Sequence, residues 1–429
     1  MNLLCISNGH GEDAIALPVL QELRRLPNPP AKIIALPIVG MGKAYTDNNF
    51  AIAGAVQTMP SGGFNQDSRQ MIRDLQGGLL GLTIDQIKTV QNWARSGGKI
   101  LAVGDIVPLF FAWLSGADYA FIGTAKSEYY IRDTQGQILS SQRNRIEART
   151  GAYYFPWERW LLSSQRCKAM FARDRLTAEI LQQHRVPAFD LGNPMTDGVL
   201  SDLNQPKLDR SDSVTSDRAS SLTVTLLPGS RPPEADANWA QIIIAANSLI
   251  SVCKQPALIF LAAIDPKLDL DTLQRILRDL GWTQVTTTDR DLTDLCTDST
   301  AIYYRQERAT LVISNRSYRQ FLNASDCAIA MAGTATEQFI SLGKPAFIIP
   351  GRGPQFTPAF AAAQTRLLGE SVILVPQAQD VGVQIDRLLQ QPNRLQSIAQ
   401  NGLLRMGTPG AAKRIADCLM EVMGERDHA

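Results

Sequence analysis

The stretch that decides the fold is residues 331–338, which read MAGTATEQ. It follows the apolar run 327–330, predicted as a buried strand, and it leads into a predicted helix over 336–342. A strand that passes through a turn of small residues into a helix leaves the first amide N–H groups of that helix available to an anion. A carboxylate in the first helical turn can accept hydrogen bonds from a ribose diol beside a diphosphate. The stretch therefore predicts a nucleotide-sugar site containing Gly333, Thr334, Ala335, Thr336 and Glu337.

The composition indicates a globular protein with two domains. The chain has 429 residues, 45% of them hydrophobic and 19% charged, and a chain of this length normally forms more than one core. The net charge of +1 predicts no general attraction to nucleic acid. The six cysteines form no C-x-x-C pair and have no histidine close by in the sequence, which argues against a zinc site and a disulfide framework.

The sequence also bears on location. The N-terminus lacks the basic segment and the cleavage site of a secretory leader. No apolar run approaches the roughly 18 residues of a membrane-spanning helix. We therefore expect a cytoplasmic protein, which can still lie on the inner face of the cytoplasmic membrane.

Short apolar runs alternate with amphipathic ones along the chain, a pattern typical of parallel sheets covered by helices on both faces. The polar stretch 201–221 interrupts this rhythm and is the predicted linker. The predicted strands are 3–7, 31–36, 100–103, 119–122, 222–227, 257–261, 327–330, 346–349 and 372–375. The predicted helices are 15–26, 84–94, 239–252, 270–280, 336–342, 385–389 and 411–422.

The opening loop, residues 7–14, reads SNGHGEDA and fits the dinucleotide pattern G-x-G-x-x-A. A dinucleotide site needs an acidic residue at the end of the second strand, where this chain reads LPIV over 36–39. His10, at the carboxyl end of the first strand, instead suits a general base. The alternative is that the His10 side chain only makes a hydrogen bond within the turn. The first-loop residues that we assign to the acceptor side are Asn8, Gly9, Gly11 and Glu12.

A carboxylate follows the predicted strand 100–103. Asp105 could orient His10 or take the acceptor proton itself. Equally, Asp105 could cap the helix that follows, because aspartate is a favoured N-cap residue. Glu12 and Asp13 lie in a first helical turn, where acids are expected from the helix dipole alone, and they are reserve candidates.

The strand 222–227 ends in a turn that carries a guanidinium. Gly229, Ser230 and Arg231 follow this strand, and an arginine fork suits a diphosphate leaving group without a metal. The alternative is a surface arginine. The D-x-D motif at Asp269 and Asp271 resembles a metal motif, but we interpret it as helix capping and predict no metal and no cofactor.

Aromatic and basic residues gather in the first half, around Trp157 and Trp160 and on to Arg175, with apolar stretches at 77–82 and 110–114. Such a combination can press into anionic headgroups, although core packing explains many apolar residues of this kind.

Several of these motifs together resemble a known family. They are the runs 226–231 (LLPGSR) and 333–337 (GTATE), and 170–174 (MFARD) leading to 192–197 (GNPMTD). They are similar to lipid-A-disaccharide synthase and, more closely, to the lipid-A-disaccharide synthase-related proteins of cyanobacteria, over about residues 170–420. The resemblance implies an α/β GT-B fold, in which two Rossmann-like domains have parallel sheets that face each other across a cleft. The implied domains are an acceptor-binding domain (1–200), the linker (201–221), a nucleotide-sugar-binding domain (222–408) and a helix that crosses back to the first domain (409–429).

The resemblance also implies roles for individual residues. Glu337 would hold the donor ribose, and Ser230, Arg231 and the turn at 333–334 would hold the diphosphate. The segment 351–356 (GRGPQF), with Gln355, is similar to the segment that reaches the donor sugar in related peptidoglycan-precursor and glycolipid transferases.

Two departures from these families limit the transfer of specificity. The transferases carry an asparagine beyond that glutamine where this chain has Pro358, so the donor sugar stays open. The loop 9–11 (GHG) resembles the glycolipid transferases more than it resembles the synthase, whose loop is acidic and lacks histidine.

The hypothesis from the sequence is a metal-independent, inverting glycosyltransferase that moves a sugar from a UDP-sugar to a lipid or lipid-linked acceptor at the cytoplasmic membrane face. His10, aligned by Asp105, would be the base. The alternatives are a nucleotide-sugar 2-epimerase on the same fold, a nucleotide-sugar-binding partner protein without activity, and an NAD-type oxidoreductase.

Overall fold

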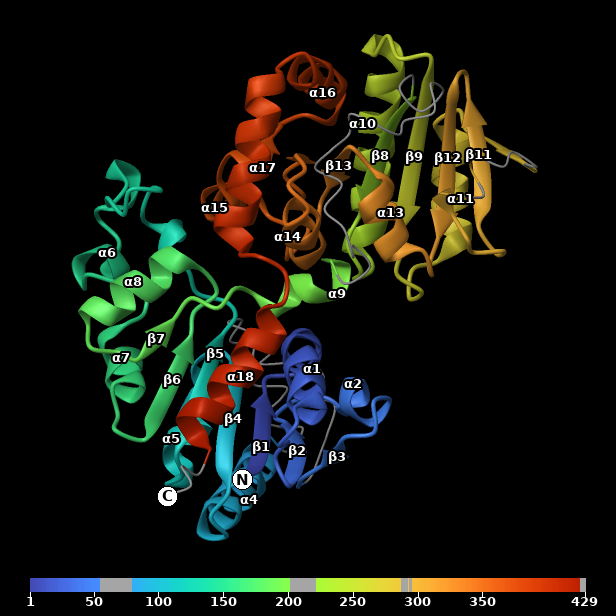
Figure 1. The fold of residues 1–429 in the computed structure, drawn as a ribbon. Helices are drawn as coiled ribbons and strands as arrows, with labels where there is room; N and C mark the ends of the chain where they lie inside the picture. The colour runs from blue at the N-terminus through green and yellow to red at the C-terminus, as the bar shows by residue number, and fades with distance from the viewer. Residues whose placement is uncertain (55–78, 201–220, 287–291, 293–294, 425–429) are drawn as a thin grey trace. The chain divides into compact units, whose positions relative to one another are not determined.

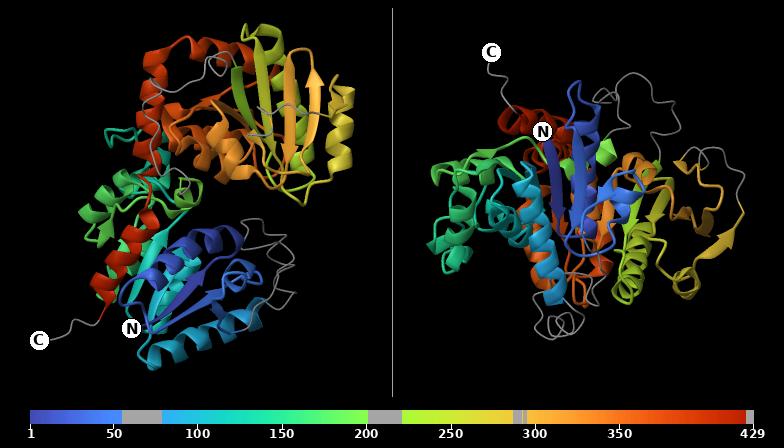
Figure 2. Two further views of the ribbon diagram at one scale, coloured as in Figure 1. Left: turned by 45° about the vertical axis from the view of Figure 1, so that its right-hand side comes forward. Right: turned by 90° about the horizontal axis from the view of Figure 1, so that it is seen from below.

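The computed structural model describes residues 1–54, 79–200, 221–286, 292 and 295–424 (Figures 1 and 2). The chain divides into two compact units, one formed by Met1–Gly198 with Gly407–Ala429 and the other by Val199–Met406. Each unit contains a sheet built largely of parallel strands, which confirms the predicted α/β class. Of the predicted linker, residues 201–220 lie outside the described part of the chain, and Ser221 opens a strand.

The described part of the first unit contains a seven-stranded sheet in the order β3-β2-β1-β4-β5-β6-β7, and all its pairings are parallel. In the register of the central strands, Cys5 of β1 lies opposite Ala35 of β2 and Leu101 of β4. The strands are β1 (Asn2–Ser7), β2 (Lys32–Pro37), β3 (Ala51–Ile52), β4 (Lys99–Gly104), β5 (Tyr119–Gly123), β6 (Cys167–Phe171) and β7 (Ala188–Phe189).

Both faces of this sheet are buried. Leu3 and Cys5 of β1 belong to a core shared with α1 (His10–Arg25) and α18 (Ala411–Met423). Leu4 and Ile6 belong to the opposite core. Successive strand side chains point to opposite faces, so a strand buried on both faces is a continuous apolar run in the sequence. The helices of the opposite core are α4 (Leu79–Arg95), α5 (Ile106–Ser115), α7 (Pro156–Leu162) and α8 (Arg175–Gln183).

The chain returns to the first unit with α18, whose start is held by a carboxylate. Asp197 accepts hydrogen bonds from the amides of Gly410 at 2.9 Å, Ala411 at 3.1 Å and Ala412 at 2.6 Å. These amides would otherwise lack a partner at the helix N-terminus. Short helices complete this part of the chain: α2 (Lys43–Thr46), α6 (Ile146–Arg149), α9 (Asp197–Leu200), η1 (Glu128–Tyr130), η2 (Ser140–Gln142) and η3 (Pro194–Thr196).

The described part of the second unit contains an eight-stranded sheet in the order β10-β11-β12-β9-β8-β13-β14-β15. The strands from β12 to β15 are parallel, whereas β11 is antiparallel to both of its neighbours. The strands are β8 (Ser221–Leu227), β9 (Ala257–Ala263), β10 (Thr283–Val285), β11 (Ile302–Gln306), β12 (Ala309–Ser314), β13 (Cys327–Ala330), β14 (Ala346–Ile348) and β15 (Val372–Leu374).

Helices cover this sheet on both faces, as Figure 1 shows. In the described residues α10 packs against α11, α16 and β13, and α13 packs against β8 and β9. The helices are α10 (Glu234–Val252), α11 (Leu270–Asp279), α13 (Tyr318–Ala324), α14 (Thr334–Ile340), α15 (Pro358–Leu368), α16 (Val381–Leu389) and α17 (Pro392–Met406), with η5 (Gly369–Ser371) and η6 (Ala378–Asp380). No described helix combines the length and the apolar character of a membrane span.

Candidate functional site

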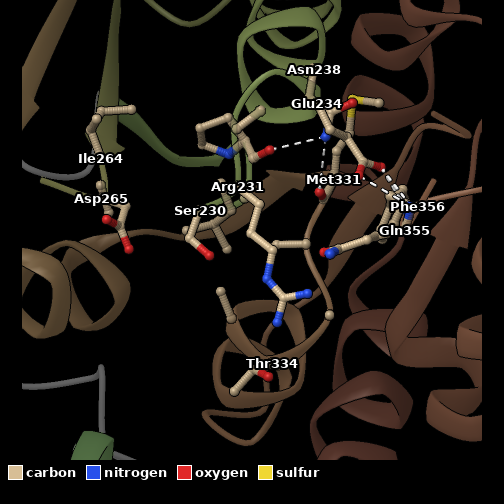
Figure 3. A pocket seen from close by; sticks show the side chains of 18 of the residues that line it. Ser230, Arg231, Glu234, Asn238, Ile264, Asp265, Met331, Thr334, Gln355 and Phe356 are labelled. Atoms are coloured by element: carbon tan, nitrogen blue, oxygen red, sulfur yellow. Dashed lines mark hydrogen bonds between the residues drawn. The ribbon is translucent and has the colours of Figure 1, made fainter. Parts of the chain in front are cut away.

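A cavity of about 500 Å³ lies in the second unit, where the chain leaves the carboxyl ends of β8, β9, β12 and β13 (Figure 3). Ligands of parallel α/β sheets bind at this edge. The cavity is lined by residues of the segments 227–238, 263–266, 314–318, 331–338 and 355–360.

The turn after β8 supplies a cation to the cavity. Gly229 has a positive φ of 95°, and a β-carbon there would lie 3.4 Å from the carbonyl oxygen of Met331, so the turn passes close to the loop after β13. Arg231 is the one arginine or lysine among the described lining residues, and it extends between Ser230 and Thr334 (Figure 3). None of the ion pairs between described residues includes Arg231. The cavity therefore offers an unneutralised guanidinium to an anion.

A buried acid, which the sequence had not indicated, fixes the loop that carries Gln355. Glu234 is only 8% exposed, and its carboxylate accepts hydrogen bonds from the amides of Gln355 at 3.1 Å and Phe356 at 2.6 Å (Figure 3). Gly353 is needed beside it, because a β-carbon at this position would clash with the Glu234 side chain. The predicted residue Gln355 thus lines the cavity from a loop that is held by charge-assisted bonds.

Amide side chains fix the loop after β13. Asn238, one helical turn after Glu234, donates to the carbonyl oxygens of Pro228 at 3.1 Å and Met331 at 3.4 Å. Gln364 donates to Ala332 at 3.2 Å and to the following glycine carbonyl at 3.1 Å. These bonds couple the turns after β8 and β13, so the two sides of the cavity are preorganised.

The predicted site residues at the start of α14 do not all line the cavity. Gly333, Thr334 and Ala335 line the cavity, and the helix begins without a side-chain cap. The next two predicted residues, Thr336 and Glu337, are not among the lining residues. The Thr336 hydroxyl is buried and donates to the carbonyl of Ala332 at 2.6 Å.

Gln338 lines the cavity instead of Glu337, and it accepts a hydrogen bond from the hydroxyl of Tyr318 at 2.6 Å. The difference between the two neighbouring residues follows from helix geometry, because one residue turns a side chain by about 100° around the axis. Glu337, the predicted ribose-binding acid, is partly exposed but is not among the residues that line the cavity.

The conformation of the opening loop of the first unit depends on Gly9 and on the start of α1. α1 begins at His10, and the position of the His10 side chain lies outside what the structure describes. Gly9 has a φ of 123°, and a β-carbon there would lie 3.0 Å from the carbonyl oxygen of Val39. The backbone thus needs glycine before the predicted base. At Gly11, by contrast, a β-carbon would meet nothing within 4 Å.

Asp105 caps α5, as the alternative interpretation predicted. Its carboxylate accepts from the amide of Val107 at 2.9 Å. A β-carbon at Gly104 would lie 3.2 Å from side-chain carbons of both Asn8 and Glu12, so the loops after β1 and β4 touch. Burial raises the pKa of Glu12, and the charge of Asp105 raises it further, against a backbone hydrogen bond that lowers it. Glu12 is thereby a better proton-transfer candidate than the sequence indicated.

A buried chain of hydroxyls fixes the base of the opening loop. Tyr45 donates to the hydroxyl of Ser7 at 2.7 Å, and Ser7 donates to the carboxylate of Asp13 at 2.6 Å. All three side chains are buried. Asp13 is therefore held in a hydrogen-bond network as well as in a first helical turn.

The predictions on capping and thiols can also be checked. Asp269 caps α11 by accepting from the amide of Thr272 at 3.2 Å and from its hydroxyl at 2.6 Å, which confirms the capping interpretation. The six cysteines are free thiols. Among the described residues no group of three histidine, cysteine or acidic side chains is placed to hold a metal ion.

Comparison with known proteins gives a clear result at the level of structure alone. No family model matches the chain, and no curated protein matches it. The UDP-GlcNAc 2-epimerase from Neisseria meningitidis bound to UDP-GlcNAc is 16% identical, with a TM-score of 0.55, over 98% of this chain and 100% of that chain. MnaA of S. aureus in a co-structure with UDP is 12% identical, with a TM-score of 0.55, over 99% and 97%. Acinetobacter baumannii MurG is 12% identical, with a TM-score of 0.54, over 98% and 99%.

At these identities the similarity shows the fold. The neighbours are GT-B proteins with two Rossmann-like domains, so the predicted GT-B fold is confirmed.

Proposed function

We propose that the protein is a UDP-sugar enzyme whose second unit holds the UDP group in the cavity around Arg231. The observation that carries the proposal is one unpaired guanidinium in a cavity at the carboxyl edge of a parallel sheet, beside the uncapped start of a helix. A permanently charged, planar fork suits a diphosphate. Structural neighbours that are named as UDP-GlcNAc 2-epimerases or as MurG, all on this fold, support the same ligand class.

Within the cavity we assign the diphosphate to Arg231, Ser230 and the turn at Gly333 and Thr334. The ribose diol needs an acceptor. Asp265 is the described lining carboxylate that suits this role, because Glu234 is already engaged by two loop amides. Asp265 uses one oxygen to accept from the amide of Lys267 at 2.9 Å, which leaves its other oxygen for a ligand.

For the reaction, we put 2-epimerisation of the UDP-linked sugar first, because several similar structures are enzymes named for it. Such a reaction needs a group that exchanges a proton with the sugar. Burial raises the pKa of Glu12, and the Asp105 loop is its neighbour, which suits a proton-transfer role. His10 is the second candidate, from its place at the end of β1.

The second candidate function is sugar transfer from UDP to a lipid or lipid-linked acceptor at the cytoplasmic membrane face, as in the lipid-A-disaccharide synthase-related proteins. Two observations favour it: the similarity to MurG, and exposed aromatic side chains on the first unit. Here the same group, Glu12 or His10, would remove the proton of the acceptor hydroxyl.

Product analysis separates these functions. The purified protein is incubated with UDP-GlcNAc alone, and proton NMR follows the sugar. A new anomeric signal for the C2 epimer, with UDP still attached, supports epimerisation. Release of UDP only when a lipid extract is added supports transfer. UDP-GlcNAc that binds but stays unchanged under both conditions would contradict an enzyme and leave a nucleotide-sugar-binding protein.

A further inference from the structure

Large aromatic side chains lie exposed on two neighbouring helices of the first unit. We call Phe110 and Trp113 of α5 and Trp157 and Trp160 of α7 the aromatic face. Phe110 is 43% exposed, Trp157 57% and Trp160 62%. Rings on the two helices touch, because the centroids of Phe110 and Trp113 are 6.0 Å apart and those of Trp113 and Trp160 are 5.2 Å apart.

The aromatic face is continuous across α5 and α7. The two helices pack against each other, and Trp157 precedes Trp160 by three residues, so both project from one side of α7. Trp157 also stacks on Phe155, with centroids 4.5 Å apart. Contiguous exposed apolar surface of this kind marks an interaction site, whereas single exposed apolar residues do not.

The charges around the aromatic face are net positive, although one of the cations, Lys168, pairs with the partly exposed Asp118 at 3.4 Å. Residues 106–115 contain no charged side chain, and residues 156–168 contain one acid and three bases. The acid, Glu158, is buried and paired with Lys126 at 2.5 Å. The guanidinium of Arg166 lies 6.0 Å from the ring centroid of Trp113 and donates to the carbonyl oxygen of that residue at 2.9 Å. Tryptophans are thus combined with fixed cations, without an exposed acid on either helix.

We propose that the aromatic face docks the first unit on an anionic membrane surface. Tryptophan is enriched at the level of lipid headgroups, because its ring is apolar and its indole N–H can still donate. Cations beside the rings gain energy from anionic lipids. A protein partner or a second copy of this chain would meet the same net positive charge, which favours an anionic lipid surface as the occupant. The purpose of such docking rests on the proposed transfer to a lipid, whereas the docking itself can be tested without turnover.

The experiment compares two double variants with the wild-type protein. Trp157→Ala/Trp160→Ala removes the two most exposed rings of the face. Leu403→Ala/Leu404→Ala on α17 is the matched control, because those side chains are also exposed, at 46% and 42%, but lie in the second unit. Each protein is sedimented with vesicles of phosphatidylcholine and phosphatidylglycerol, and with vesicles of phosphatidylcholine alone.

We expect the wild-type and control proteins to bind the anionic vesicles alike, and the tryptophan variant to bind about tenfold more weakly. Salt should weaken the wild-type binding. The proposal is overturned if the tryptophan variant binds as the wild type does, or if the wild type does not distinguish the two lipids. It is also overturned if light scattering shows a wild-type dimer that the tryptophan variant dissociates, because the face would then seat a second copy.

Thermal stabilisation by UDP is measured on the same three samples. It should be equal in all three, since the exchanged residues do not line the cavity. If the tryptophan variant loses vesicle binding but UDP still stabilises it, the exchanged tryptophans act in membrane docking and not in UDP binding. If UDP stabilises none of the three proteins, the proposed UDP binding is contradicted and the docking proposal is unaffected.

Discussion

Individual site residues were predictable where a motif follows a strand directly. Gly229, Ser230 and Arg231 follow β8, and the turn at 333–335 follows β13, so a strand pattern was enough to place them. α14 begins at Thr334, two residues before the predicted start, and the register of this helix places Gln338, and not Glu337, among the lining residues. No composition rule fixes such a register.

The buried polar residues of α10 were missed for a different reason. Glu234 and Asn238 are spaced by four residues, which places them on one face of a helix, and that spacing was visible in the sequence. Their partners are backbone groups of loops that are distant in the chain, such as the Phe356 amide and the Met331 carbonyl. Only the fold brings these groups together.

Glu234→Gln should loosen the loop that carries Gln355. Glutamine offers one acceptor oxygen where the carboxylate offers two, so one of the bonds to the amides of Gln355 and Phe356 is weakened or lost. We expect the free energy of unfolding of the second unit to fall by about 1–3 kcal/mol. Urea denaturation measures it, with Glu179→Gln, an exposed position on α8 of the first unit, as the control. An unchanged midpoint in the Glu234 variant would contradict the anchoring role.

Glu12→Gln should change the pH dependence of stability. The pKa of Glu12 is raised in the folded state by burial and by the charges of Asp105 and Asp13. The stability that this protonation contributes is complete below the ordinary glutamate pKa and is lost as the pH rises through the folded value. The melting temperature of the variant, minus that of the wild type, should therefore be small near about pH 4 and grow more positive toward about pH 8. A difference that is flat or that falls with pH would show that the Glu12 carboxyl is not perturbed.

At the scale of elements, continuous apolar runs predicted most central strands, since parallel strands are buried on both faces. The interior strands β6 and β12 were missed, although β12 is wholly buried and β6 mostly so. The edge of the second sheet was missed as well, because β10 and β11 are partly exposed and β10 has only three residues. The antiparallel order of β10, β11 and β12 corrects the expectation of a purely parallel sheet. An edge strand with one wet face lacks the signal that reveals a central strand.

Asp197→Ala should release the start of α18. The change removes an acceptor shared by three helix amides, so we expect a loss of about 1–2 kcal/mol and faster hydrogen exchange at the first turn of α18. Asp197→Asn keeps one acceptor oxygen and should lose less. Exchange rates in α18 that match the wild type in both variants would argue against this clamp.

At the scale of the whole molecule, length and composition predicted a globular α/β protein, and the alternating pattern predicted two sheets. The proposed ligand-binding and proton-transfer residues divide between the two units. The cavity lies entirely within Val199–Met406, whereas Glu12 and Asp105 belong to the first unit. The sequence analysis placed sugar transfer before epimerisation on the basis of the family resemblance, but no residue pattern separates them, because both reactions use the same ligand class and the same fold.

Hydrogen exchange with UDP tests this division. Protection should appear in the loops after β8, β9 and β13 and in the segment 351–356, because these loops form or support the cavity. Residues 8–12 of the opening loop should exchange as they do without UDP. Protection at that loop in place of the second-unit loops would mean that the nucleotide binds at the glycine pattern of the first unit.

The most direct test of the UDP-binding claim is calorimetric titration of UDP into the wild-type protein, the Arg231→Ala variant and the Arg352→Ala variant. Arg352 is an exposed arginine that does not line the cavity, so its removal controls for charge. We predict that the wild-type and Arg352→Ala proteins bind UDP with similar affinity, and that Arg231→Ala weakens binding by about tenfold or more. Equal binding by the wild-type and Arg231→Ala proteins, or no binding by the wild type, would contradict the account.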